Sequence, residues 1–408
     1  MRYTLLAFLC VITIIAYIQR SALSVPSKQI EAELAMTPQN MGTVWLVWYT
    51  GYALFQLPAG WVVHRLGSKP ALIGFAVTWS ALTALVGAAT GFASLTVLWG
   101  LMGIAQSGIF VCAAKAVGAT FPNTERAFAS GALQCCMAGG AALSVSVTGQ
   151  LLGALTWQEI LAVYAIPGLV WAIVFALAVP RPEGPVLAPV VPAGTPPAPV
   201  EWSRLLTDRQ MVLLCAQQLQ RAGAVALLFT WFPRYLQEAQ GLSVTESGRL
   251  AAWPLLAGIP GALLGGVASD RLLRRTGHDR LSRPGLAGAG TAVCAAASFA
   301  AFYAADATTA VALVCVAAFC AYASGGIAYA VAIAMGGKQV APVFATMNMA
   351  GNVGAALFPY AVGQVVGETG KWNVTMLLFA GMFVGSTVCW ALLNPKGPLF
   401  ETQRPRAD

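Results

Sequence analysis

One short motif occurs twice in this chain, first as Gly60-Trp-Val-Val-His64-Arg65-Leu-Gly67-Ser-Lys69 and, 206 positions later, as Gly266-Val-Ala-Ser-Asp270-Arg271-Leu-Leu-Arg274-Arg275-Thr-Gly277. Both copies have a glycine, an arginine five positions later and further basic residues. Each copy follows a long apolar run at the same place in its half of the sequence. A repeat of this kind predicts a duplicated architecture with a functional site between the two halves.

The composition is that of a membrane protein. Of the 408 residues, 58% are hydrophobic and 9% are charged, and the mean hydropathy is +0.71. These values exclude an ordinary water-soluble domain. The apolar runs are long and continuous, which excludes a β-barrel. No small-residue cleavage site follows the first run, so we expect it to be retained as a helix.

Twelve membrane-spanning helices are predicted from the apolar runs and the polar breaks between them. They cover residues 4–30, 40–63, 70–91, 93–119, 128–154, 158–179, 210–237, 243–269, 285–305, 308–334, 341–366 and 372–394. The fold class is therefore an all-α membrane protein of two six-helix bundles. We place the bundles at 1–180 and 208–397, a proline-rich cytoplasmic linker at 181–207 and a cytoplasmic tail at 398–408.

The net charge of +8 reflects membrane topology. With a cytoplasmic amino terminus, about 17 of the 23 Lys and Arg residues lie in cytoplasmic loops or termini and about four lie outside. This positive-inside bias predicts a multi-pass inner-membrane protein with both termini in the cytoplasm and no nucleic-acid partner. The nine cysteines lie in apolar runs without metal-ligand spacing, so we expect no metal and no other cofactor. We expect a monomer in the lipid bilayer.

The repeated motif resembles the signature of the major facilitator superfamily, whose fold has two pseudo-symmetric six-helix bundles. Further segments are similar to its anion:cation symporter family, which includes bacterial galactonate and hexuronate transporters and the sialins. They are Tyr17-Ile-Gln-Arg20-Ser-Ala-Leu-Ser-Val, Tyr52-Ala-Leu-Phe-Gln-Leu-Pro-Ala-Gly-Trp61, Phe121-Pro-Asn-Thr-Glu125-Arg126-Ala, Thr230-Trp-Phe-Pro-Arg-Tyr-Leu236 and Ser269-Asp-Arg-Leu-Leu-Arg-Arg275. The resemblance implies an organic-anion transporter that works by alternating access.

The chain departs from the family pattern where proton coupling would be expected. Gln19 stands where the first helix of the family usually has aspartate, and Gln106 stands where galactonate-type members have a second acid. Trp99 replaces an arginine of those members, and His64 replaces the aspartate of the loop motif. The resemblance therefore carries over the fold but not the proton-coupling mechanism.

Two arginines, Arg20 and Arg221, lie deep in predicted helices. Burying an arginine in hydrocarbon costs at least about 2.5 kcal/mol, so each predicts a functional site that faces water. None of the fifteen Asp and Glu residues and neither histidine is placed at the midplane. Two unpaired guanidinium groups predict an electropositive cavity that suits a carboxylate or phosphate. Lacking a titratable group, the cavity predicts uniport or anion exchange; proton symport through another group is the alternative.

Uncharged polar residues of the predicted helices extend this candidate substrate site. They are Tyr17, Gln19, Tyr52, Gln106, Gln134, Gln217, Gln218, Asn348 and Asn352. Amides and phenols hydrogen-bond hydroxyl and carboxylate groups without adding charge. The same side chains also form hydrogen bonds between helices in membrane bundles. The resemblance aligns Tyr52 with a substrate contact of the family.

The loop motifs are interpreted as gates. The candidate gating residues are Gly60, His64, Arg65, Glu125, Arg126, Gly266, Asp270, Arg271, Arg274 and Arg275. Ion pairs at Asp270-Arg271 and Glu125-Arg126 would open and close as the bundles rock. The alternative is that the basic residues only set the topology. Five tryptophans fall near predicted helix ends, where they favour the membrane interface: Trp45, Trp48, Trp157, Trp231 and Trp372.

These features predict a secondary transporter for a monocarboxylic sugar acid or a comparable organic anion. The paired arginines also suit a dianion, so a sugar-phosphate or phosphate antiporter is the alternative within transporters. A receptor that kept the fold but lost transport is a further alternative. No nucleophile–base pair, metal cluster or phosphate-binding loop indicates an enzyme.

Overall fold

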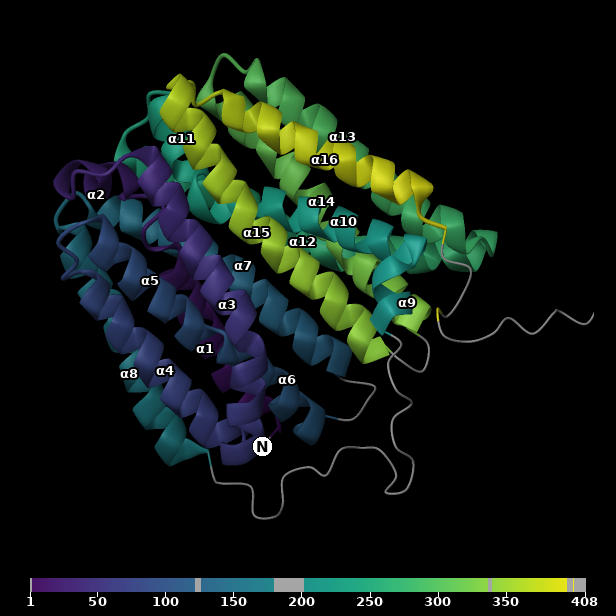
Figure 1. The fold of residues 1–408 in the computed structure, drawn as a ribbon, viewed down its shortest axis with the longest axis horizontal. Helices are drawn as coiled ribbons and strands as arrows, with labels where there is room; N and C mark the ends of the chain where they lie inside the picture. Colours follow the sequence, from purple (N-terminus) through teal and green to yellow (C-terminus); the bar gives the residue numbers. More distant parts are fainter. Residues whose placement is uncertain (1, 122–125, 180–201, 337–339, 395–398, 400–408) are drawn as a thin grey trace, which may run out of the picture.

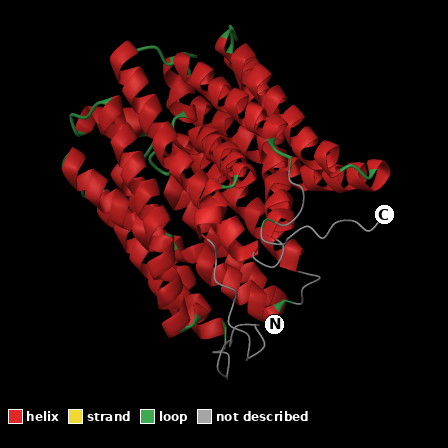
Figure 2. Cartoon of the chain, turned by 45° about the vertical axis from the view of Figure 1, so that its right-hand side comes forward, coloured by secondary structure: helices red, strands yellow, loops and turns green. Residues whose placement is uncertain are grey.

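The computed structural model describes residues 2–121, 126–179, 202–336, 340–394 and 399. The described residues are predominantly helical and include no strand (Figure 2). The helices are α1 (Arg2–Ser21), α2 (Ser27–Glu33), α3 (Pro38–Leu66), α4 (Ser68–Val86), α5 (Phe92–Gln106), α6 (Gly108–Thr120), α7 (Arg126–Leu151), α8 (Trp157–Ala178), α9 (Trp202–Thr207), α10 (Arg209–Thr230), α11 (Phe232–Glu238), α12 (Val244–Thr276), the π-helix η1 (Leu281–Gly285), α13 (Leu286–Phe302), α14 (Ala307–Gly336), α15 (Val340–Thr369) and α16 (Val374–Leu392).

Twelve long helical segments confirm the predicted all-α membrane fold. Ten segments of the described chain are long and apolar enough to span a bilayer, with α5 and α6 counted together. The other two, α3 and α15, have 29 and 30 residues and pack against each other (Figure 1). Both helices also contribute side chains to the cavity described below. Part of their surface therefore faces water and protein, which permits a more polar composition than a lipid-facing helix can have.

Three of the predicted helices are interrupted. The predicted helix 4–30 ends at Ser21 and is followed by the separate α2, 93–119 is broken at Ser107, and 210–237 is broken at Trp231. Proline starts both new short helices: Pro26 caps α2, and Pro233 lies in the first turn of α11. Proline has no N–H to continue the preceding helix but fits the start of the next one. The predicted linker also contains a helix, α9.

The two halves meet at two helix crossings. α3 packs against α15, and α7 packs against α12, while the other extensive helix contacts lie within α1–α8 or within α10–α16 (Figure 1). Glycines bring the crossing backbones together: Gly42 lies against Gly363, and Gly149 lies against Gly248. A methyl group on Gly149 would lie 3.1 Å from the Cα of Gly248. Small residues permit this close approach of helices in membranes.

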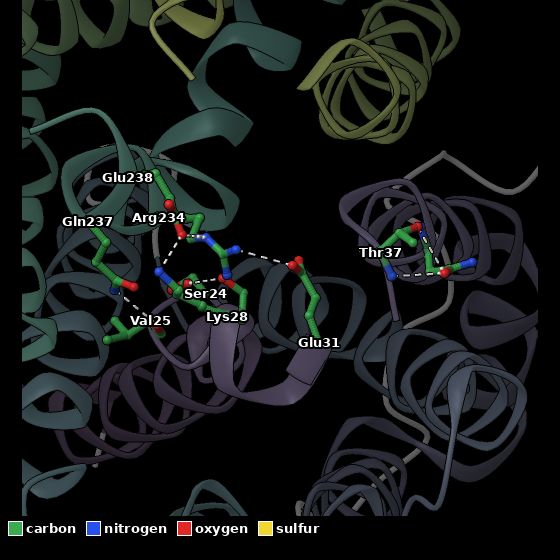
Figure 3. Close-up of polar contacts among 10 residues, drawn as sticks. Ser24, Val25, Lys28, Glu31, Thr37, Arg234, Gln237 and Glu238 are labelled. Atoms are coloured by element: carbon green, nitrogen blue, oxygen red, sulfur yellow. Dashed lines mark hydrogen bonds and ion pairs between the residues drawn. The ribbon is translucent and has the colours of Figure 1, made fainter. Parts of the chain in front are cut away.

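The end of the molecule that carries α2 and α11 is held together by charges, and we call it the closed end (Figure 3). Arg234 Nη2 lies 3.2 Å from Glu31 Oε2, and Arg234 Nε lies 3.0 Å from Glu238 Oε1. Lys28 Nζ lies 3.0 Å from the same Glu238 oxygen. The Arg234 and Glu31 side chains are only 7% and 6% exposed. Ion pairs thus join the first half, through α2, to the second half, through α11.

Candidate functional site

A cavity of about 650 Å³ lies between the two halves. Helices α1, α3, α6 and α7 of the first half and α10, α14 and α15 of the second half line it. Its polar lining residues are Tyr17, Arg20, Tyr49, Tyr52, Gln56, Gln134, Gln218, Arg221, Tyr322, Tyr329, Asn348 and Asn352. The cavity therefore has the location that the sequence repeat predicts for a functional site.

Arg20 lies in the last turn of α1 among aromatic rings. Its guanidinium carbon lies 4.2 Å from the ring centroid of Trp48 and 4.9 Å from that of Tyr49. The rings of Tyr17 and Tyr52 lie 5.2 Å from it. Aromatic faces attract a cation because of their negative quadrupole. These four rings thus stabilise the charge of Arg20 without neutralising it.

Few hydrogen bonds hold Arg20. Its Nη1 donates to the hydroxyl of Tyr17 over 3.3 Å. Its Nε is buried without a hydrogen-bond partner. A guanidinium has five N–H donors. Arg20 also lines the cavity, so the Nη N–H groups that Tyr17 does not accept from are the ones that a molecule in the cavity could use.

Arg221, in the middle of α10, is held differently. Its Nε and Nη2 donate to Oε1 of Gln218, over 3.2 and 3.1 Å, and its Nη1 donates to the carbonyl oxygen of Ala321 over 3.4 Å. A methyl group on Gly325 would lie 2.8 Å from Nη1, so this glycine makes room for the guanidinium. Arg221 is 8% exposed and presents its charge to the cavity from the second half.

Within the described part of the chain, no acid neutralises either arginine. No Asp, Glu or His residue lines the cavity, and neither Arg20 nor Arg221 forms an ion pair there. Two positive charges that face one cavity without a counter-ion are costly in a low-dielectric environment. A bound anion would reduce this cost, and the surrounding amides and phenols would supply further hydrogen bonds to it.

The other predicted site residues divide into two groups. Tyr17, Tyr52, Gln134, Gln218, Asn348 and Asn352 line the cavity. The amides of Gln19, Gln106 and Gln217 lie away from it and bond within one half. Gln19 Nε2 donates to the carbonyl oxygen of Tyr164 over 2.7 Å, and Gln106 Nε2 donates to that of Ala16 over 3.1 Å. Gln217 Nε2 donates to the carbonyl oxygen of Leu214 over 2.9 Å. The amides of Gln19 and Gln106 thus join different helices, as the alternative interpretation expects, whereas Gln217 bonds within α10.

Several aromatic residues of the site were missing from the sequence-based set. Tyr49, Tyr322 and Tyr329 line the cavity, and Trp48 packs behind Arg20. Tyr49 shares a helix face with Tyr52, three positions later, and this spacing could have identified it. Trp48, expected near a helix end and the membrane interface, is only 1% exposed and lies inside the first bundle.

The gating residues lie away from the cavity. Asp270, Arg271, Arg274 and Arg275 are exposed on the last turns of α12, and Asp270 and Arg271 form no ion pair among the described residues. Arg65 lies over the ring of Trp61, at 4.1 Å. Gly60 and Gly266 have open space or only distant contacts beside them. Glu125 lies outside the described residues, as do the side chains of His64 and Arg126.

Comparison with known proteins identifies the architecture. A sequence model of the Major Facilitator Superfamily matches residues 9–278. The chain is 28% identical to a probable sulfoacetate transporter of Cupriavidus necator, over 97% of this chain and 94% of that protein. It is 29% identical to a hexuronate transporter of Bacillus subtilis, over 92% and 91% of the two chains.

A third relative is a probable galactarate/D-glucarate transporter of Escherichia coli, at 25% identity over 92% of this chain and 89% of that protein. Among solved structures, a bacterial homologue of the human lysosomal transporter Spinster, in an inward-facing and unoccupied conformation, superposes with a TM-score of 0.74. That pair is 19% identical over 96% of this chain and 94% of the other. The structural likeness supports the fold.

Proposed function

The chain belongs to the Major Facilitator Superfamily, and we propose that it moves small organic anions across a membrane by alternating access. It is a multi-pass membrane protein, and its family and relatives are transporters, not enzymes. The observation that carries the proposal is the placement of Arg20 and Arg221, from opposite halves, in one cavity whose described lining contains no acid. Such a cavity favours a negatively charged cargo.

The presence of two arginines in one cavity supports a cargo with two anionic groups. Galactarate and D-glucarate, named for one relative, carry two carboxylates, and sulfoacetate, named for another, carries a sulfonate and a carboxylate. One anionic group at Arg20 and the other at Arg221 would satisfy both charges. The tyrosine and amide groups between them would bind the hydroxyls of a sugar acid. Hexuronate, named for a third relative, carries one carboxylate and would rely more on these polar groups.

A sugar-phosphate or phosphate antiporter remains the second candidate because a phosphate ester is also a dianion that an arginine fork binds. Competition distinguishes the two classes. If uptake of labelled D-glucarate is inhibited by galactarate but not by glucose 6-phosphate, the cargo is a carboxylate. The reverse order of inhibition would favour the phosphate antiporter.

The closed end supports the alternating-access part of the proposal. Ion pairs and the two glycine crossings hold the halves together there, while the cavity lies between the same halves. Rocking of the two bundles about the central site would break these contacts and open the cavity to the other side. With both termini in the cytoplasm of an inner-membrane protein, as the basic loops predict, the closed end faces outward.

We further propose uniport or anion exchange as the mode of transport. A proton symporter needs a group that titrates with the cargo, and the described cavity lining offers no carboxylate or imidazole. Accumulation of D-glucarate driven by an imposed pH gradient, without a counter-anion inside, would contradict this mode. It would favour proton symport through another group.

Reconstitution into liposomes tests the whole proposal. Purified protein should accelerate the entry of labelled D-glucarate or sulfoacetate over empty vesicles, whereas galactitol, a neutral analogue of galactarate, should enter no faster. Equal rates with and without protein for every anion would indicate a receptor that does not transport. Faster entry of galactitol than of the anions would contradict an anion site. Size-exclusion chromatography with light scattering would test the expected monomer.

A further inference from the structure

Trp48 lies beneath Arg20 but outside the cavity lining. Of the four rings around the guanidinium, it is the nearest, at 4.2 Å, and the only one that does not line the cavity. Its exposure of 1% leaves no surface for a cargo molecule to contact. Any influence of Trp48 on the cargo must therefore act through Arg20.

The Trp48 ring is fixed from three sides. Its Nε1 donates to the sulfur of Met102 over 3.2 Å. A methyl group on Gly103 would lie 3.1 Å from Cγ of Trp48, so this glycine lets α5 approach the indole. The Tyr52 ring stacks on Trp48 with a centroid separation of 5.3 Å and an interplanar angle of 10°. The tryptophan is thus a rigid support and not a mobile side chain.

We propose that Trp48 is a positioning residue for cargo binding, which holds the Arg20 guanidinium by its ring face and leaves the N–H donors of Arg20 to the anion. A carboxylate partner would hold the guanidinium equally well, but it would accept those N–H bonds and neutralise the charge. An aromatic face attracts the cation without accepting hydrogen bonds in the guanidinium plane. The proposal rests on the proposed anion-transport function.

The two arginines then have unequal roles. Arg221 uses three N–H contacts on Gln218 and Ala321, whereas Arg20 uses one on Tyr17. The ring-supported arginine has more donors to offer and is the stronger anion ligand of the pair. Loss of Trp48 should therefore weaken the binding of every anionic cargo, whether it has one or two acidic groups.

Substitution with a matched control tests the proposal. Trp45 lies one helical turn before Trp48, is 2% exposed and packs edge-on against Trp99 at 5.7 Å. Trp45→Leu is therefore the control. It removes an indole of the same helix that is equally buried but makes no ring contact with Arg20. We expect Trp48→Leu to raise the dissociation constant of D-glucarate about tenfold, the loss of a desolvated cation–π contact. Trp48→Phe should raise it less than about threefold because a phenyl face remains.

In transport assays, KM for D-glucarate should increase most in Trp48→Leu and less in Trp48→Phe, and kcat should change less than KM. Trp45→Leu should lower the melting temperature comparably but leave the D-glucarate dissociation constant within about twofold. Equal affinities in Trp48→Leu and Trp45→Leu would overturn the positioning role. An equal loss of D-glucarate affinity in Trp48→Phe and Trp48→Leu would also overturn it.

A readout without cargo separates this proposal from the proposed function. Phenylglyoxal modifies uncharged guanidinium groups, and mass spectrometry measures its reaction at Arg20. Modification should be several-fold faster in Trp48→Leu than in wild type or Trp45→Leu, because the ring face no longer stabilises the cation. If wild type binds neither D-glucarate nor sulfoacetate, the proposed cargo class fails while this comparison still decides the role of Trp48. Equal modification rates in all three proteins would overturn it.

Discussion

Arg20 and Arg221 share one cavity but have different surroundings, and these predict different responses to substitution. Arg20 rests on aromatic faces and donates one hydrogen bond to Tyr17, whereas Arg221 donates hydrogen bonds to Gln218 and Ala321. Arg20→Gln should lower the affinity for D-glucarate and for D-gluconate alike, by about a hundredfold. This corresponds to the loss of a charge-assisted contact of roughly 3 kcal/mol.

Arg221→Gln should discriminate between these two anions. D-glucarate has a second carboxylate for Arg221 and should lose about tenfold in affinity. D-gluconate, with one carboxylate at Arg20, should lose much less. Isothermal titration of both anions measures the difference. An equal loss for both anions would remove the second carboxylate from Arg221.

The two arginines of the site were predictable from the sequence. The direction in which the side chains next to them point was not. Arg20 and Arg221 are identified by their charge in apolar runs, because burial of an unpaired arginine is costly. Gln19 is adjacent to Arg20, yet consecutive residues on a helix do not face the same way. Its amide points into the first bundle, toward Ser80 and Tyr164. Which face of α1 borders the cavity depends on packing that hydropathy does not record.

The short helices α2 and α11 provide the charged contact between the halves. The two residues of its buried ion pair, Glu31 and Arg234, have different numbers of oppositely charged neighbours. Arg234 has two acids, Glu31 and Glu238, whereas Glu31 has only Arg234 within ion-pair distance among the described residues. Arg234→Gln leaves the Glu31 carboxylate buried and unpaired, which should destabilise the closed end by about 3 kcal/mol. Glu31→Gln leaves Arg234 with Glu238 and removes a charge that burial disfavours, so it should not destabilise the closed end.

Hydrogen exchange of α2 and α11, read by mass spectrometry, tests this asymmetry. Exchange should increase strongly in Arg234→Gln, should not increase in Glu31→Gln, and should return toward wild type in the double variant, which buries no unpaired charge. Arg249→Gln, at an exposed arginine near the start of α12, is the control. Similar exchange in Arg234→Gln and this control would show that the ion pair does not hold the closed end.

The same contact predicts a pH dependence. Burial raises the pKa of the Glu31 carboxyl above its usual 4.5, although the facing Arg234 and the nearby Lys28 oppose this rise and Glu238 adds to it. Opening to water would return the pKa toward the usual value, so the closed state binds the proton more tightly. The stability that this proton adds to the closed state is fully present below pH 4.5 and is lost as the pH rises through the raised pKa of Glu31.

Acid should therefore protect α2 and α11 from exchange, after correction for intrinsic rates. Glu31→Gln should abolish this pH dependence. Greater protection at neutral than at acidic pH in wild type would contradict the assigned direction.

Hydropathy located the long helices but not the short ones. A run such as 4–30 remains apolar across Ser21–Pro26, because the buried turn is itself packed in the protein. Apolarity therefore does not distinguish a helix from a buried turn. Pro26 and Pro233 gave a local signal for two of the three breaks, whereas the break at Ser107 has no proline beside it.

The molecule as a whole is a pair of similar bundles whose closed end depends on backbone contact between glycines. A methyl group on Gly248 would collide with α7 at Val145 and Gly149. Gly248→Ala should therefore push the halves apart at the closed end and increase exchange in α2 and α11. Gly139→Ala, on α7 with no neighbour within 4 Å, is the control. Unchanged exchange in Gly248→Ala would show that this crossing tolerates separation.

The repeated motif and the apolar runs predicted the two-bundle architecture, because duplication and bilayer thickness act on the whole chain. The closed state was not predictable from them. It depends on contacts between distant segments, such as Glu31 with Arg234, which hydropathy places near the ends of two separate predicted helices without pairing them.

The central claim is that one organic anion binds between Arg20 and Arg221 without an acid nearby. A structure of the protein saturated with D-glucarate measures this directly. One carboxylate should lie within hydrogen-bond distance of Arg20 and the other within that distance of Arg221. D-glucarate bound without contact to Arg20, or an arginine turned away from the cavity onto a carboxylate of the protein, would contradict the claim.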